Sequence, residues 1–343
     1  MDRTEFAAIL NSIQIPEGCD VETLQRTVKP ISHALVEMMP DKLFRYRNCS
    51  EMSVEAFEND KVYALTADMF NDPYDMLLRF DIEAVKNMFN SLLSNESFYR
   101  LKNVLGKGKT LPDIVKQNFD QENISQIKNI VLSITNDSEI DSFVSNRRNE
   151  VMDMVDLYFP LLATFVNKRT ATISCFSETI KSVTMWSHYA DYHKGFALEY
   201  EMRPTLTKGI KEGVGLYPVI YDDIRYDASQ YMAWAFLKMF GISAPNPDVL
   251  SHTKCALHKS RQWEYENEWR LVDYSTRNYL VENITSINYK PTAIYYGVHI
   301  SNENKERLHK IAKAKGIAEF DMYIDYSSPK YEMMYKSHKS SSD

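Results

Sequence analysis

Residues 173–201 constrain the fold of this chain most, because they contain a strand, a short helix and a second strand in immediate succession. The first strand is the apolar run at residues 173–177, which ends in polar side chains. Ser182 is a suitable N-cap for a helix over residues 183–192. Apolar and other side chains alternate over residues 196–201, as expected of a half-buried strand. We therefore expect strands and helices to alternate in one domain.

Short strand patterns recur on both sides of a long helical stretch. Further strands are expected at residues 42–47, 61–64, 214–221, 261–274, 293–296 and 320–324. Helical spacing covers much of residues 1–41, about 82–166, 229–240, 250–261 and the segment after Ser301. The predicted fold class is α+β, with a mixed, largely antiparallel sheet, flanking helices and an inserted helical block.

Three regions are expected along the chain. Residues 1–41 form N-terminal helices, and residues 42–330 form a single α+β domain with the helical insertion at about 82–166. Residues 331–343, which are rich in Lys and Ser, form a flexible tail.

Composition excludes several classes of protein. The net charge of −7 gives no general attraction to nucleic acid or to an anionic membrane. Hydrophobic content of 44% is typical of a folded chain. The four cysteines form no CxxC pair and no apolar segment reaches spanning length, so we expect a cytoplasmic protein. No GxGxxG, GxxxxGK or GxSxG motif is present.

The helix at residues 183–192 carries aromatic and imidazole side chains on two faces. One face holds Trp186, Tyr189 and His193, and the other holds Met185, His188 and Tyr192. Two interpretations stay open. The side chains pack in the core with their polar atoms hydrogen-bonded, or they form the wall of a pocket for a flat, polar ligand.

Two other segments place charges where a ligand could meet them. Residues 42–47 alternate so that Arg45 and Arg47 project from one face, and an arginine within a sheet usually meets a carboxylate or a phosphate. Residues 261–274 in strand conformation place four charged side chains in one row: Glu264, Glu266, Glu268 and Arg270. Facing a cleft, such carboxylates need cations or protons, and their pKa values rise.

Five segments together resemble a known bacterial family. They are LFRYR, FNDPYD, CFSE, MWSHYADYHKGFALEY and WEYENEWR. In this order they are similar to the family called domain of unknown function 2971, over roughly residues 43–297 without the helical block. The family name implies no chemistry.

A second resemblance implies a reaction. The order of an arginine on an early strand, a strand that ends in serine and a late Glu-Asn-Glu strand is similar to that of mono-ADP-ribosyltransferases. This resemblance implies that Arg47, with Arg45 beside it, binds NAD, and that Ser177 holds the nicotinamide ribose. Glu268 would stabilise the oxocarbenium-like transition state and Glu266 would orient the acceptor.

The same resemblance implies that NAD is the substrate and that an unknown protein or nucleic acid accepts ADP-ribose. Trp186, His188, Tyr189 and Tyr192 would line the cofactor site, with the aromatic rings stacking on nicotinamide. A role as a toxin or phage-defence effector follows by analogy alone. No metal and no membrane partner are expected.

Two alternatives stay open. One is a metal-dependent hydrolase or nuclease in which four potential ligands converge: His188, His193, Glu199 and Glu268. The spacing of five between the two histidines places them far apart around a helix, which weakens this alternative. The other is a non-catalytic binding or regulatory module.

Overall fold

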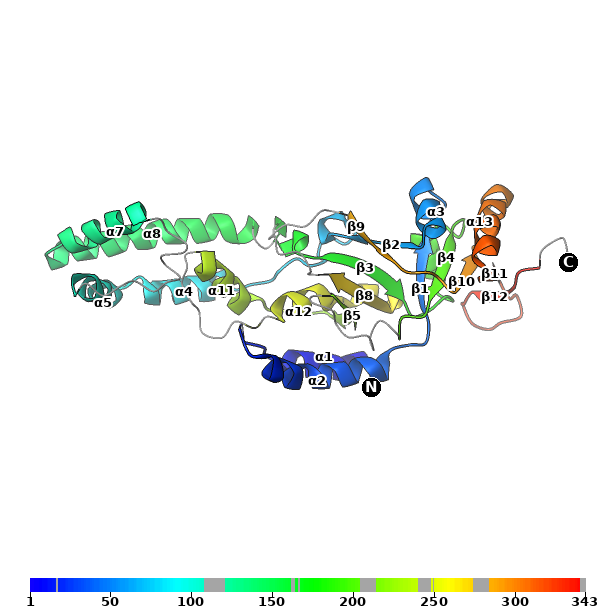
Figure 1. Cartoon of the computed structure of the whole chain (residues 1–343), viewed down its shortest axis with the longest axis horizontal. Helices are drawn as coiled ribbons and strands as arrows, with labels where there is room; N and C mark the ends of the chain where they lie inside the picture. Colours follow the sequence, from blue (N-terminus) through cyan, green and yellow to red (C-terminus); the bar gives the residue numbers. More distant parts are fainter. Residues whose placement is uncertain are drawn as a thin grey trace.

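The computed structural model describes residues 1–16, 18–107, 121–161, 164–165, 167–203, 214–239, 248, 250–273 and 284–339 (Figure 1). The predicted α+β class is confirmed. Its centre is a mixed sheet of ten strands in which β10 and β11 are the parallel neighbours and the other printed pairs are antiparallel. None of the described helices is long and apolar enough to cross a membrane.

The strands follow the path β12-β11-β10-β4-β1-β3-β2-β9, and β8 pairs with both β3 and β5. Their bounds are β1 (Leu43–Arg47), β2 (Lys61–Leu65), β3 (Thr172–Ser177), β4 (Phe196–Tyr200), β5 (Val214–Pro218), β8 (Glu268–Asp273), β9 (Ile284–Asn288), β10 (Ala293–Tyr296), β11 (Ala318–Tyr323) and β12 (Met334–Ser337). A separate parallel pair is formed by β6 (Ile220–Asp222) and β7 (His258–Ser260).

Helices cover the sheet and extend from it. Their bounds are α1 (Arg3–Ser12), α2 (Val21–Met38), α3 (Glu51–Glu58), α4 (Ile82–Leu92), α5 (Asn95–Gly106), α7 (Gln121–Ser133), α8 (Asp137–Leu161), α9 (Val183–Tyr189), α11 (Ser229–Met239), α12 (Ser251–Leu257) and α13 (Asn302–Lys315). In Figure 1, α1 and α2 lie along β5 and β8, and α5, α7 and α8 form an arm that points away from the sheet. Short 3₁₀ turns include η1 (Ala67–Met69), η3 (Asn167–Arg169) and η4 (Arg261–Glu266).

The sheet opens between β1 and β3. β1 pairs with β4 along five residues, but it meets β3 at the single register pair Phe44↔Ser177. β3 likewise meets β2 at the single pair Leu65↔Ile173. Strands that share one register pair diverge on either side of it, so space is left at this point of the sheet for side chains or a ligand.

The helix predicted at residues 183–192 is shorter than expected. It ends at Tyr189, because Asp191, Tyr192 and His193 have φ values of 46°, 54° and 68°, in the left-handed region. Gly195 follows and lies very close to β1. A Cβ atom at Gly195 would lie 2.0 Å from the Arg47 carbonyl oxygen, so no larger residue fits there without a shift of backbone.

The prediction of a strand at residues 261–274 is wrong for the first half of that range. Residues Arg261–Glu266 form the 3₁₀ turn η4, Asn267 adopts a left-handed conformation with φ 44°, and only then does β8 begin. The four charged side chains therefore do not form one row on a strand. The neighbouring helix also ends early, at Leu257, so that residues 258–260 belong to β7.

Two further expectations differ at their boundaries. The strand predicted at residues 214–221 is divided into β5 and β6. The predicted tail at 331–343 contains β12, which pairs with β11 from Met334 to Ser337, while residues 340–343 lie outside the described part of the chain. Helices do occupy the described part of the block at 82–166.

Candidate functional site

A cavity of ≈ 390 Å³ lies where the sheet opens. Residues of β1, β2 and β3 line it, together with η1 and the loop after it, α9, η4 and the start of β8. Seven of the residues predicted from the sequence line this cavity: Arg45, Arg47, Ser177, His188, Tyr189, Glu266 and Glu268. No described residue of the helical block lines it.

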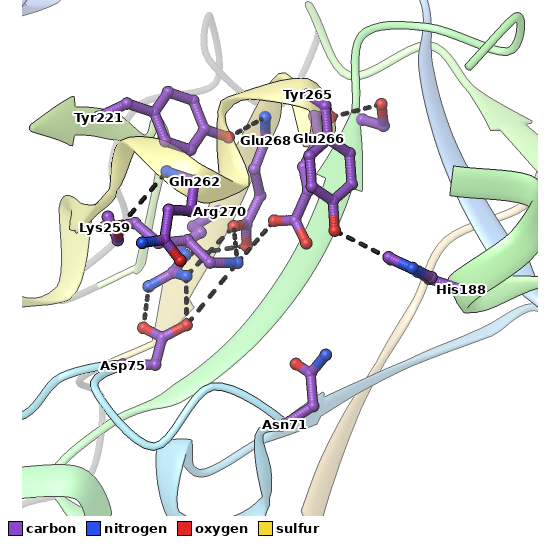
Figure 2. Close-up of polar contacts among 12 residues, drawn as sticks. Asn71, Asp75, His188, Tyr221, Lys259, Gln262, Tyr265, Glu266, Glu268 and Arg270 are labelled. Carbon is purple, nitrogen blue, oxygen red and sulfur yellow. Dashed lines mark hydrogen bonds and ion pairs between the residues drawn. The ribbon is translucent and has the colours of Figure 1, made fainter. Parts of the chain in front are cut away.

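Glu266 and Glu268 share one buried cation. Lys259 Nζ lies 2.5 Å from Glu266 Oε2 and 3.0 Å from Glu268 Oε2 (Figure 2). The left-handed Asn267 makes this possible, because it separates the last residue of the 3₁₀ turn from the first residue of β8. Both carboxylates are 3% exposed, so their electrostatic interactions with Lys259 are only weakly screened by solvent.

A second buried cation holds Glu268 in place. Arg270 is fully buried and donates from Nη1 and Nη2 to the two oxygens of Asp75, each at 2.7 Å. Its Nε donates to Glu268 Oε1 at 2.9 Å. Burial alone would raise the pKa of Glu268, but Arg270 and Lys259 lower it well below its ordinary value. Glu268 is therefore ionised and has both oxygens paired.

The cluster of Asp75, Lys259, Glu266, Glu268 and Arg270 contains three carboxylates and two cations, so it carries one excess negative charge when all are ionised. Burial, followed by the nearby Glu268, raises the pKa of Glu266 to about 7, against the lowering effect of Lys259. A proton on Glu266 would balance the excess charge of the cluster.

Two arginines that line the same cavity bring positive charge to it. Within the described part of the chain, neither Arg45 nor Arg47 forms an ion pair with a carboxylate. Arg45 is 7% exposed, its Nη2 donates to the Tyr63 carbonyl, and its Nε and Nη1 have no hydrogen-bond partner. Burial lowers the pKa of Arg47. Among the described residues, Arg45 and Arg47 thus bring to the cavity positive charge that no carboxylate pairs.

Helix α9 supplies the aromatic part of the site. The Tyr189 hydroxyl donates to Glu266 Oε1 and lies 3.4 Å from the Asn71 amide nitrogen. His188 Nδ1 is 3.0 Å from the Tyr265 hydroxyl (Figure 2). These contacts connect α9 to η4, so the aromatic wall and the carboxylates are held in one arrangement.

Two of the predicted residues lie elsewhere. Trp186 is fully buried in the core and donates from Nε1 to the Ile180 carbonyl at 2.8 Å, which agrees with the core interpretation for this side chain. Tyr192 is 71% exposed and does not line the cavity, because α9 ends before it. The prediction that these two rings contact a ligand is therefore wrong for this cavity.

Ser177 lies in the cavity wall, but its hydroxyl is already used. Ser177 Oγ donates to the Glu266 carbonyl oxygen at 2.7 Å, and the side chain is buried. The bond fixes the end of β3 against η4. In this arrangement Ser177 positions the Glu266 backbone.

The four potential metal ligands proposed from the sequence do not converge. Glu199 contacts Lys42 and accepts from the hydroxyls of Thr292 and Tyr295. His193 Nε2 lies 3.1 Å from Ser187 Oγ, and neither Glu199 nor His193 lines the cavity with Glu268.

The sequence reasoning missed Lys259, Asp75 and Arg270 as site residues. Lys259 was assigned to a helix, whereas β7 directs it toward the carboxylates. Asp75 belongs to the polar loop FNDPYD, where the short polar side chains also fit an ordinary turn. Alternation along 268–270 places Glu268 and Arg270 on one face. This alternation is the sequence signal that identifies Arg270 as a neighbour of Glu268.

Comparison with known proteins gives one match. Residues 185–271 match the sequence model of a family described as a protein of unknown function (DUF2971), which confirms the expected resemblance over that part of the chain. The matched part contains Lys259, Glu266 and Glu268, while Arg45 and Asp75 precede it. No curated protein matches the chain. No solved structure matches it either.

Proposed function

We propose that the chain binds NAD in this cavity and cleaves the bond between nicotinamide and ribose, as an ADP-ribosyltransferase or an NAD glycohydrolase. One observation carries the proposal: two arginines without carboxylate partners and a pair of buried carboxylates line the same cavity. NAD combines a diphosphate anion with a glycosidic bond whose cleavage builds positive charge.

The arginines account for the anionic part of the ligand. Arg45 has two unpartnered nitrogens, and Arg47 lies two residues along the same strand. Guanidinium groups bind phosphate oxygens through charge-assisted hydrogen bonds. A diphosphate would supply negative charge for both guanidinium groups.

The carboxylates account for the chemistry. When the C1′–N bond breaks, its electron pair leaves with nicotinamide and positive charge develops on the ribose. A fixed carboxylate in a site that excludes water stabilises that charge. Water or an acceptor nucleophile then bonds to C1′ and loses a proton. The excess negative charge of the cluster has the sign that this transition state requires.

The contacts favour Glu266 as the carboxylate that meets the sugar. Both carboxylates have both oxygens paired, but Glu268 is paired with two cations, Lys259 and Arg270. Glu266 is paired with one cation, Lys259, and accepts from the Tyr189 hydroxyl at the cavity wall. Glu268 would then act through Lys259, by keeping the ammonium group positioned. This exchanges the roles that the resemblance implies for the two glutamates.

The test is release of nicotinamide from NAD, with and without cell lysate as a source of acceptor. We expect Glu266→Gln to lower the rate by at least about 100-fold, since a main electrostatic contribution is lost. Glu264→Gln is a matched control, because Glu264 is exposed on the same 3₁₀ turn. Equal rates in wild type and Glu266→Gln would refute the assigned role.

A non-catalytic binding module is the second candidate. It is favoured by the fully paired oxygens of Glu268 and by the structural hydrogen bond of Ser177. An NAD-induced rise in melting temperature without turnover would select it. No rise and no turnover would reject NAD as the ligand and leave a module that binds another partner. The acceptor, and a role as toxin or phage-defence effector, belong to the first candidate by analogy alone.

A further inference from the structure

A second cluster of chemically competent side chains lies away from the cavity, where α13 packs beside β11 and β12. It consists of His309, Glu319 and His338, each of which offers one ligand atom, and these atoms lie within 4.8 Å of one another. None of the three lines the cavity. The cluster is therefore independent of the proposed function.

Three separate elements bring these residues together. In the register of β11 and β12, Phe320 pairs with Ser337, and the His338 amide donates to the Glu319 carbonyl at 2.9 Å, so Glu319 and His338 are cross-strand neighbours. His309 comes from α13, directly after the fully buried Leu308. The backbone positions of all three ligands are thus fixed by the fold.

The cluster has the supporting contacts that metal sites require. His338 Nδ1 lies 2.9 Å from Asp321 Oδ2, an arrangement that orients the ring and leaves Nε2 for an ion. His309 Nδ1 lies 2.8 Å from Glu319 Oε2. The Tyr296 hydroxyl donates to the same Glu319 oxygen and orients that carboxylate.

The net charge of the cluster and the exposure of its side chains also suit a bound cation. Glu319 and Asp321 contribute two negative charges and Lys305, which contacts Asp321 at 2.7 Å, contributes one positive charge. With neutral imidazoles the cluster has one excess negative charge. The side chains of His309, Glu319 and His338 are 18%, 15% and 15% exposed, so an ion can enter from solvent and still be mostly enclosed by protein.

We propose that His309, Glu319 and His338 bind one divalent transition-metal ion. Two imidazoles and a carboxylate are a ligand set that suits Zn²⁺, with a fourth position for water. The ion would link α13, through His309, to the end of the short edge strand β12, through His338.

The probe is Zn²⁺ added to the full chain after treatment with a chelator and removal of that chelator. We expect one equivalent to bind, with a rise in melting temperature. His309→Gln and His338→Gln each remove a ligand, so binding weakens by at least about tenfold. Asp321→Asn keeps all three ligands and weakens binding about 10- to 100-fold, as loss of an orienting carboxylate does.

His33→Gln is the matched control, because His33 is an exposed histidine on α2 outside the cluster. It should bind Zn²⁺ like the wild type. Circular dichroism of each variant without metal checks that it is folded. No binding of Zn²⁺ or Co²⁺ by folded wild type would overturn the proposal, and so would equal binding by His309→Gln, Asp321→Asn and wild type.

Discussion

At the scale of single residues, the site depends on charges that are buried and nearly balanced. Arg270 is fully buried and satisfies Asp75 and Glu268 together. Lys259 satisfies Glu268 and Glu266. Removing one member of such a cluster leaves another buried charge unpaired, which costs far more than loss of an exposed ion pair. Several neighbouring contacts therefore fix the position of the Glu266 side chain.

The raised pKa of Glu266 predicts how stability and activity change with pH. Its pKa rises from 4.5 when exposed to about 7 in the fold, through burial and Glu268. The protonated group therefore contributes stability that is present below about pH 4.5 and is lost as the pH rises through about 7. Nicotinamide release should increase over the same window, because the proposed catalytic form of Glu266 is the ionised one.

The measurement compares free energies of unfolding of wild type and Glu266→Gln across that window. The stability of wild type relative to Glu266→Gln should fall by at most about 3.5 kcal/mol, since the pKa rises from 4.5 to about 7 and one pKa unit corresponds to about 1.4 kcal/mol. Glu264→Gln should show no such trend. A constant difference between wild type and Glu266→Gln would mean that Lys259 keeps Glu266 ionised throughout.

At the scale of elements, the close approach of Gly195 to β1 holds the arginine strand in position. The Cβ atom of an alanine at 195 would lie 2.0 Å from the Arg47 carbonyl oxygen and 3.0 Å from that of Ala190. We expect Gly195→Ala to lower the free energy of unfolding by about 3 kcal/mol, because backbone must move. Urea denaturation measures the change.

Gly316→Ala is the control for that prediction. Gly316 ends α13 with φ 65°, and no atom lies within 4 Å of its added Cβ. Its substitution should cost about 1–2 kcal/mol, from the left-handed backbone alone. If the two variants lose equal free energy of unfolding, the close approach of Gly195 to β1 does not explain the loss in Gly195→Ala.

Patterns of period two and 3.6 predicted most of the elements, but not the turn that builds the site. The alternation at 42–47 placed Arg45 and Arg47 on a strand, and that strand is β1. The Glu-Asn-Glu segment contains no glycine, so its left-handed residue at Asn267 gave no clear signal. Lys259 joins the site through long-range pairing of β6 with β7, which local periodicity does not encode.

The pairing of two neighbouring glutamates with one lysine also depends on tertiary packing. From the sequence, Glu266 and Glu268 were expected in one row, and the structure instead places them across a turn. Trp186 and Tyr189 share a predicted helix face, yet one ring lies in the core and the other lines the cavity. Spacing shows which side chains share a face, and packing decides what that face contacts.

At the scale of the whole molecule, the far part of the helical arm is a self-contained unit. Among the described residues, its buried apolar cluster comes from α5, α7 and α8: Phe98, Leu105, Val131, Ile140 and Val144. The base of the arm packs separately, with Val85, Phe89, Val155 and Phe159 against Ala228 and Met232. In Figure 1 the arm projects from the sheet.

This division predicts that the far part can be removed. Arg148 Nη2 donates to the Leu93 carbonyl at 2.8 Å, so a short Gly-Ser linker can replace residues 95–146. The shortened chain should fold and keep the NAD-induced shift in melting temperature expected of the full chain, because none of the removed residues that the structure describes lines the cavity. Loss of that shift in a folded protein would show that the arm contributes to ligand binding.

The pairing of Asp75 with Arg270 also sets an order of assembly during translation. The two residues are 195 positions apart in the chain. A ribosome that adds about 5–20 residues per second therefore exposes Asp75 roughly 10–40 s before its partner exists. Until then the nascent polypeptide carries Arg45, Arg47 and Asp75 without the carboxylates of β8. The proposed activity can thus arise only after the ribosome has passed residue 270.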